Sequence, residues 1–235
     1  MKLSVRQQVC LIHCGEAVEQ WKVLHERLRR VKYLADSQIT SDLLSGASAV
    51  LVDEAHLLSQ EKLEYLLRYC GKRPVIFSSD YENMLSPEEL DRAAVHALEQ
   101  ISGIQSFRLT NRIRTNAEIS SFIQNMMCLP ERKKGRHFPH VTVLYANDDR
   151  EADVLLSDAQ HQGYQVILNE AEPAICAGRL AMVLDQRYFY DRQNYLRSED
   201  RSVRRLFHQL NGAKEELLLV VKQNEPLYAA LLDLL

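Results

Sequence analysis

Residues 49–56, which read Ala-Val-Leu-Val-Asp-Glu-Ala-His, decide the fold. The four apolar residues 49–52 are typical of a strand that is buried on both faces, and two acids follow directly at Asp53 and Glu54. In open α/β sheets the functional groups gather where the strands end. The stretch therefore predicts a parallel sheet with Asp53 and Glu54 at its carboxyl edge.

Short apolar runs alternate with amphipathic stretches on both sides of this segment, which is typical of an α/β fold. We expect further strands over residues 9–14, 74–77, 106–109, 141–145, 164–168, 180–184 and 217–221. We expect helices over residues 16–31, 60–70, 116–127, 149–162 and 198–210, and from residues 86 and 226 onward. Residues 129–140 include proline, glycine and a cationic run without periodicity, so they form the predicted linker between domains 1–128 and 141–235.

The composition is that of an ordinary globular protein. Hydrophobic residues make up 46% of the 235 residues and charged residues 26%, which suffices for a sizeable core. The formal net charge of −3 gives no overall attraction to nucleic acid, so nucleic-acid binding would depend on local patches. We find no apolar stretch of membrane length and no signal peptide. The five cysteines form no CxxC pair, so we expect reduced thiols, no zinc and a cytoplasmic location.

Four blocks carry a resemblance to a known family. Residues 50–56 match the Walker B pattern of nucleotide hydrolases. Residues 79–83, Ser-Asp-Tyr-Glu-Asn, stand where superfamily 1 helicases have Gly-Asp-x-x-Gln, and residues 109–115 resemble their Leu-x-x-Asn-Tyr-Arg-Ser block. Residues 206–217 resemble Leu-Tyr-Val-Ala-Leu-Thr-Arg-Ala-Lys-Glu-x-Leu. From about residue 9 the chain resembles these helicases, and most closely a bacterial group of predicted helicases similar to Schlafen-type ATPase domains.

The resemblance implies two RecA-like parallel sheets flanked by helices, with a nucleotide site on the first. Asp53 and Glu54 would be its catalytic carboxylates, and Asp53 would also be the Mg²⁺ ligand. Asp80, Asn83 and Arg114 would contact the nucleotide, with Arg114 at the γ-phosphate. Other interpretations stay open, because Asp53 and Glu54 also suit a turn whose backbone amides they satisfy. Likewise, Arg114 also suits an ion pair with Asp80 or Glu54.

The sequence departs from this family at three places. It has no G-x-x-x-x-G-K-[ST] loop, and its first strand resembles the family's second, as though the phosphate-binding strand were missing. The arginine of the last block falls on Gly212, and its threonine on Asn211. A glycine-rich block before residue 180 is reduced to Ala-Gly-Arg. We therefore expect no cofactor on the isolated chain, with Mg²⁺ and ATP bound only if a partner completes the site.

A second candidate site lies in a stretch that mixes basic and aromatic residues. Arg187, Tyr188, Tyr190 and Arg192 are the residues expected to bind nucleic acid. Arginines interleaved with aromatic rings suit single-stranded nucleic acid, since bases stack on the rings and the cations follow the phosphates. The neighbouring acids dilute this charge, so a solvated loop and helix face is the competing interpretation.

The expected function is that of a non-catalytic, helicase-like pseudoenzyme. It would act by binding a protein partner or a second copy of itself, single-stranded nucleic acid, or both, and the resemblance implies a setting in bacterial defence or a mobile element. A missing first strand would leave an exposed sheet edge or an exposed apolar face near residues 9–14 or 49–52 for such a contact. The alternative is a subunit of a split ATPase whose phosphate-binding loop comes from another chain. A metal-dependent nuclease using Asp53, Glu54 and Asp80 is a third, less favoured candidate, because supporting lysines or histidines are missing.

Overall fold

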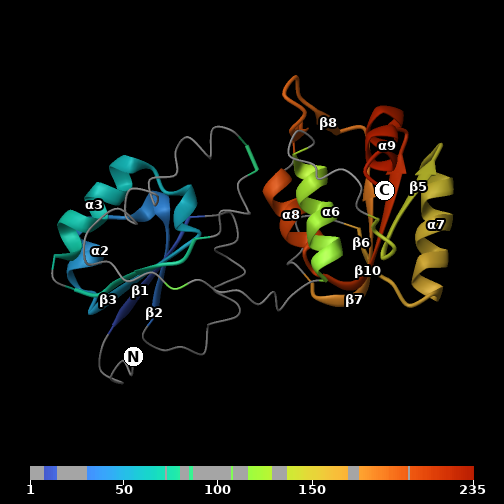
Figure 1. The fold of residues 1–235 in the computed structure, drawn as a ribbon. Coiled ribbons are helices and arrows are strands. Elements are labelled where there is room, and N and C mark those ends of the chain that lie inside the picture. The colour runs from blue at the N-terminus through green and yellow to red at the C-terminus, as the bar shows by residue number, and fades with distance from the viewer. Residues whose placement is uncertain are drawn as a thin grey trace. The chain divides into compact units, whose positions relative to one another are not determined.

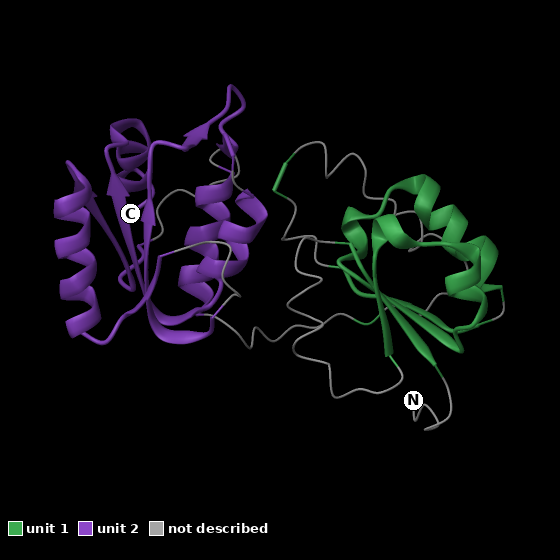
Figure 2. Ribbon diagram, turned by 180° about the vertical axis from the view of Figure 1, so that it is seen from behind, with its two compact units in different colours: residues 1–108 green, residues 109–235 purple. Residues whose placement is uncertain are grey.

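A computed structural model describes residues 8–14, 31–71, 73–79, 85–86, 107, 116–128, 137–168, 175–200 and 202–235. The chain divides into two compact units, residues 1–108 and 109–235, shown in green and purple in Figure 2. Each unit has its own parallel sheet with helices packed on it, so the predicted α/β class is confirmed (Figure 1). Within the described residues, no helix has the length and apolar character needed to cross a membrane.

The first unit contains a four-stranded parallel sheet in the order β2-β1-β3-β4. Its strands are β1 (Val9–His13), β2 (Val31–Ala35), β3 (Ala49–Asp53) and β4 (Val75–Phe77). β1 and β3 pair in register along their whole length, with His13 opposite Asp53. All five residues of β1 are buried, as expected for a central strand.

Two helices cover one face of this sheet. They are α2 (Ser41–Ser45) and α3 (Gln60–Cys70), and short 3₁₀ turns follow β2 and β3 at Asp36–Gln38 and Ala55–Leu57. Ser59 caps α3 by accepting a hydrogen bond from the amide of Lys62, which explains where the helix starts. Leu63, Leu66 and Cys70 lie on one side of α3 and pack into the core above the sheet.

The position of the sheet edges corrects one expectation. Residues 9–14 and 49–52 were expected near an exposed edge, but β1 and β3 are paired on both sides. Among the described strands the edges of this sheet are β2 and β4. β2 itself was not predicted, because its start was assigned to the helix expected over residues 16–31. Residues 15–30, the strand expected over 106–109 apart from Phe107, and most of the helix expected from 86 lie outside the described residues.

The second unit contains another four-stranded parallel sheet, in the order β5-β10-β7-β6. Its strands are β5 (Val141–Ala146), β6 (Gln165–Ile167), β7 (Ala177–Leu184) and β10 (Ala213–Lys222). β10 is the longest, and it lies between β5 and β7. Its residues 217–221 are all buried, so the apolar run expected over those residues forms the centre of the sheet.

Helices cover both faces of the second sheet, as the two opposite views in Figures 1 and 2 show. α7 (Asp149–His161) packs on one face, where Ala152, Leu156 and Ala159 meet the apolar side chains of the strands. α6 (Ala117–Met127) and α8 (Val203–Leu210) lie on the other face. α9 (Glu225–Leu232) follows β10.

α6 belongs to the second unit, although residues 117–127 were assigned to the first domain. The units divide after residue 108 rather than at the linker expected over 129–140. A hairpin that was not predicted, β8 (Tyr188–Tyr190) with β9 (Leu196–Ser198), lies beside the end of α6. There the hydroxyl of Tyr190 donates a 2.8 Å hydrogen bond to the carbonyl of Met126. α6 is therefore part of the second unit's core.

We predict that Asn224→Ala destabilises the second unit by roughly 2–4 kcal/mol. Asn224 is buried, it caps α9 by accepting a hydrogen bond from the amide of Leu227, and it donates to the carbonyls of Asp185 and Tyr188. The control is Asn116→Ala, which removes the cap of α6 and its bond from the amide of Glu118. We expect a loss of only about 1 kcal/mol there.

Urea unfolding followed by circular dichroism measures both variants. Equal losses in the two variants would contradict the structural role given to the two side-chain hydrogen bonds of Asn224.

Candidate functional site

The polar side chains of the first unit meet at the carboxyl edge of its sheet. His13 ends β1, Asp53 ends β3, and Ser78 follows β4 directly. The amide of Cys14 donates to the carbonyl of Asp53 at 3.1 Å, and the amide of Ser78 donates to the carbonyl of Val52 at 2.8 Å. These backbone bonds fix the ends of three neighbouring strands, so the side chains that follow have a defined arrangement.

Both carboxylate oxygens of Asp53 are engaged by neighbouring side chains. Nδ1 of His13 lies 3.2 Å from Oδ2, and the hydroxyl of Ser78 donates to Oδ1 at 2.7 Å. Burial alone would raise the pKa of Asp53, but the hydrogen bonds from His13 and Ser78 outweigh it and leave the pKa below its ordinary value. Asp53 is therefore ionised at neutral pH and held by donors from the two adjacent strands.

Glu54 approaches the same imidazole from the other side. Its Oε2 lies 3.5 Å from Nε2 of His13, so the ring stands between two carboxylates. The side chain of His13 is 5% exposed, that of Glu54 12% and that of Asp53 23%. Glu54 has a φ of 52°, a left-handed conformation that costs a non-glycine residue on the order of 1 kcal/mol. The chain tolerates this conformation at the very residue that carries the second carboxylate of the cluster.

The thiol beside this cluster is not reactive. Burial, together with the charges of Asp36, Glu54 and Asp53, raises the pKa of Cys14 to about 12, although Lys62 lowers it. The thiol stays protonated at neutral pH, and the thiolate is the form that acts as a nucleophile or binds a metal. Lys62 and Asp36 form an ion pair of their own. Cys14 is therefore a structural residue.

The resemblance places Mg²⁺ at Asp53, and in the structure each oxygen of Asp53 already accepts one hydrogen bond, from His13 or from Ser78. In the described part of the chain, no three His, Cys, Asp or Glu side chains are grouped to hold a metal ion. Asp53 and Glu54 lie at the expected edge, but they form an internal polar cluster with His13. Asp80, Asn83 and Arg114 lie outside the described residues.

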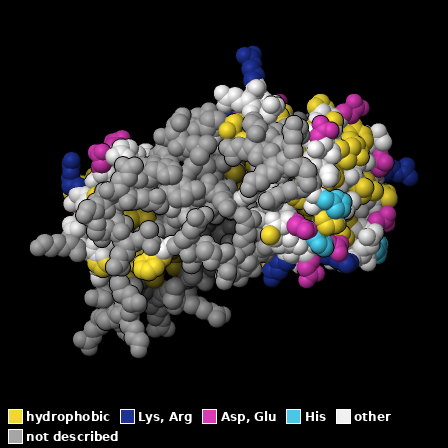
Figure 3. All heavy atoms as spheres, in the orientation of Figure 1, with side chains coloured by type: hydrophobic (Ala, Val, Ile, Leu, Met, Phe, Trp, Pro, Cys, Tyr) yellow, Lys and Arg dark blue, Asp and Glu magenta, His cyan; other side chains and the backbone are white. Residues whose placement is uncertain are grey.

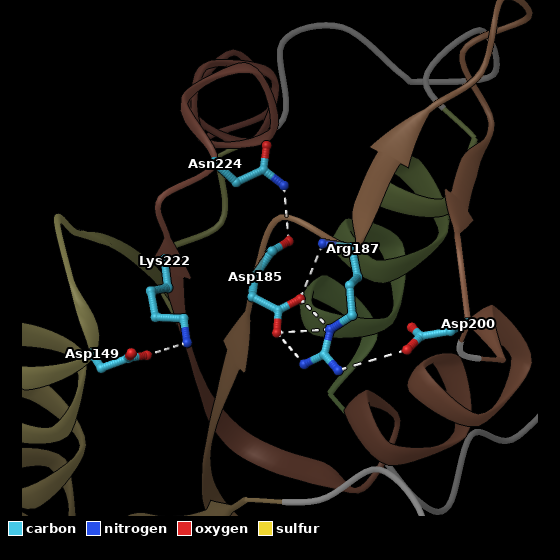
Figure 4. Close-up of polar contacts among 6 residues, drawn as sticks. All are labelled: Asp149, Asp185, Arg187, Asp200, Lys222 and Asn224. Carbon is cyan, nitrogen blue, oxygen red and sulfur yellow. Dashed lines mark hydrogen bonds and ion pairs between the residues drawn. The ribbon is translucent and has the colours of Figure 1, made fainter.

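Figure 4 shows a second group of charged side chains, at the carboxyl edge of the second sheet. Arg187 makes a two-pronged contact with Asp185, with Nε 3.0 Å from each carboxylate oxygen, and also approaches Asp200 at 3.9 Å. Lys222 pairs with Asp149. Each cation in this group faces a carboxylate, so the group stabilises the ends of β7 and β10 and offers no unneutralised positive site for an anion.

The four residues expected to bind nucleic acid do not form one surface. Tyr188 is fully buried and cannot stack on a base, which corrects that prediction. Tyr190 uses its hydroxyl to bind the carbonyl of Met126, and burial raises its pKa above the ordinary value. Arg187 is paired with Asp185, and Arg192 is exposed in the turn between β8 and β9. Only Arg192 has the exposure that the prediction required.

Gly212, where the resemblance would place an arginine, leaves no space for any side chain. A Cβ there would lie 2.0 Å from the carbonyl oxygen of Ile175 and 3.0 Å from that of Gln209. The amide of Ala177 donates a 3.0 Å hydrogen bond to the carbonyl of Gly212, which holds the two segments together. An arginine at residue 212 would require this packing to change.

His13 and Ser78 are site residues that the sequence did not reveal. His13 was visible only as a histidine near the end of an apolar run, and Ser78 as a serine after another. Their role depends on strand order, which places β1 and β4 on either side of β3. Comparison of the sequence with models of protein families and with curated proteins finds no match.

We predict that Asp53 stabilises the first unit above about pH 4, with the contribution lost at lower pH. The pKa of Asp53 is lowered in the folded state, so its contribution is complete above the unfolded value near 3.9 and disappears as the pH falls through the folded value. Asp53→Asn removes this contribution. The stability difference between wild type and Asp53→Asn should be constant above about pH 5 and shrink below about pH 4.

Urea unfolding followed by circular dichroism between pH 3 and 7 measures this difference. Asp42→Asn, at an exposed carboxylate of α2, is the control. A difference for Asp53→Asn that stays unchanged down to pH 3 would mean that His13 and Ser78 do not favour its ionised form.

A second prediction concerns the packing at Gly212. Gly212→Ala should destabilise the second unit by at least about 2 kcal/mol, because its Cβ meets backbone that cannot rotate away. Gly178→Ala is the control, since its nearest neighbour is the flexible end of Glu215 at 3.2 Å. It should change stability by less than about 1 kcal/mol. Thermal unfolding of both variants by circular dichroism separates these outcomes, and an unaffected Gly212→Ala protein would refute the close packing.

Proposed function

We propose that this chain is a non-catalytic, helicase-like protein of RecA type that acts by binding a protein partner, nucleic acid or both. The observation that carries the proposal is the position of His13 between Asp53 and Glu54, at 3.2 and 3.5 Å. These two carboxylates are the residues that the resemblance assigns to Mg²⁺ and to the attacking water. Here they are held by a histidine of the same chain.

The order of the strands supports the RecA-type assignment. β3 carries Asp53 in the interior of a parallel sheet, and β4, which precedes the block at residues 79–83, is its neighbour. In open α/β sheets this carboxyl edge is where ligands bind. A central parallel strand that ends in Asp53 is compatible with such an edge, and the side chains there contact one another.

The charges that would hold a triphosphate also support the proposal. ATP carries about four negative charges, which such enzymes neutralise with backbone amides, a lysine, an arginine and Mg²⁺. The sequence lacks the loop that supplies the amides and lysine, and packing at Gly212 excludes a side chain at the arginine position. Two carboxylates at the edge would repel the phosphates. An arginine in this role contributes on the order of 10³–10⁵ in rate.

We predict that the full-length chain neither binds ATP at micromolar concentration nor hydrolyses it. Calorimetry with ATP and Mg²⁺ and a phosphate-release assay, each with and without single-stranded DNA, measure the two properties. Glu54→Gln is the matched variant, because it removes one charge and keeps the shape of the side chain. Its phosphate release should equal that of the wild type, at the level of buffer alone.

Two results would overturn or redirect the proposal. Turnover by the isolated chain that Glu54→Gln abolishes would show an active enzyme. Turnover that appears only with a protein co-purified from the native host, and that Glu54→Gln again abolishes, would establish the split ATPase. If the chain acts by binding and not by catalysis, a co-purified partner should be retained equally by wild type and by Glu54→Gln.

A further inference from the structure

The β8–β9 hairpin has an inner and an outer face that differ in chemistry. Its register pairs Tyr188 with Ser198, Phe189 with Arg197, and Tyr190 with Leu196. Side chains alternate between the faces of a strand, and directly opposed residues share a face. Because Tyr188 and Leu196 are buried, their face is the one turned to the core. Phe189 and Arg197 therefore belong to the outer face.

The outer face presents an aromatic ring beside an arginine. Phe189 is 43% exposed, although it is a large apolar side chain. Arg197, directly opposite, places its guanidinium 5.9 Å from the centre of the Tyr195 ring, within the range of a cation–π contact. Arg192 is exposed in the connecting turn. Flat groups and cations therefore lie together on one short element.

This surface is held in place by the turn. Asp191 accepts hydrogen bonds from the amides of Gln193 and Tyr195, each at 2.9 Å, and its other oxygen binds Nε of Arg197 at 2.7 Å. These bonds keep the pKa of Asp191 low even though desolvation raises it. Asp191 is thus neutralised within the hairpin by Arg197, and Arg192 is an exposed cation in the turn.

We propose that the outer face of the β8–β9 hairpin binds single-stranded nucleic acid, with a base stacked on Phe189 and Arg192 beside the phosphates. The proposal rests on the function proposed above, and it assigns a binding site to the nucleic acid that this function includes. Base stacking on an exposed ring is insensitive to sequence, because every base has a π-face. An exposed ring and an exposed arginine on one short hairpin suit a strand that presents bases and phosphates together.

Charges of both signs surround the hairpin, so the binding energy must come from the hairpin itself. Among the described residues of the second unit that Figure 3 shows, acidic, basic and histidine side chains are interspersed, and no broad patch of positive side chains is seen. Affinity must then come from stacking and from a few close contacts. We expect weak binding that depends strongly on Phe189 and only modestly on salt.

Fluorescence anisotropy of labelled oligothymidine and oligouridine with the full-length protein tests this site. Phe189→Ala should weaken binding roughly 5- to 100-fold, and Phe189→Tyr, which keeps the ring, should retain it. Arg192→Gln should reduce the slope of log affinity against log salt by about 0.7. Phe107→Ala is the control, since Phe107 is 86% exposed in the first unit.

Each outcome decides the proposal. Loss of binding in Phe189→Ala but not in Phe189→Tyr or Phe107→Ala supports it, and the two oligonucleotides show whether DNA or RNA is preferred. No binding by wild type, or equal binding by Phe189→Ala, overturns it. Hairpin-dependent binding of a protein instead of an oligonucleotide overturns it as well. None of these results alters the phosphate-release test, so failure of the site and failure of the proposed non-catalytic function remain distinguishable.

Discussion

A carboxylate that is largely withdrawn from water must be paired, and the polar edge of the first unit follows from how Asp53 meets this requirement. Parallel pairing of β1 with β3 brings His13 level with Asp53, and β4 delivers Ser78 from the other side. One imidazole then serves two carboxylates, because the left-handed turn at Glu54 places its side chain within reach of the same ring. Both carboxylates thus contact groups of the chain itself.

Much of the fold could be predicted from hydrophobic periodicity, and the exceptions have physical causes. β3, β5 and β10 contain apolar runs that are hard to misread, and α3, α6 and α7 begin at capping residues. β2 was missed because its sequence, Val-Lys-Tyr-Leu-Ala, mixes polar and apolar residues at the end of an amphipathic stretch. The hairpin was missed because strands of three residues give too short a pattern to separate from a loop.

The candidate site was predictable only where a single segment determines it. The placement of Asp53 and Glu54 follows from one strand and its end. The contribution of His13 follows from which strands are neighbours, and strand order is set by tertiary packing that no local pattern records. At the hairpin the composition indicated a basic and aromatic segment, but the sequence alone did not show which side chains face the core. The basic and aromatic composition of this segment includes Tyr188. In the hairpin, however, Tyr188 pairs with Ser198 on the same face as the buried Leu196, so its ring is turned to the core. At Gly212 the resemblance would place an arginine, and the structure shows that the neighbouring backbone leaves no space for a side chain.

The place of β10 in the second sheet has a consequence for biosynthesis. It is the last strand of the unit to be synthesised, yet it lies between β5 and β7, so β5 has no neighbouring strand until β10 arrives. Domains generally fold as units while the chain leaves the ribosome. The second unit cannot complete its sheet before residues 213–222 have emerged, and until then the edges of β5 and β7 that β10 will pair remain without a partner strand. Chaperones that bind nascent chains would therefore meet this unit for longer than one whose strands pair in the order of synthesis.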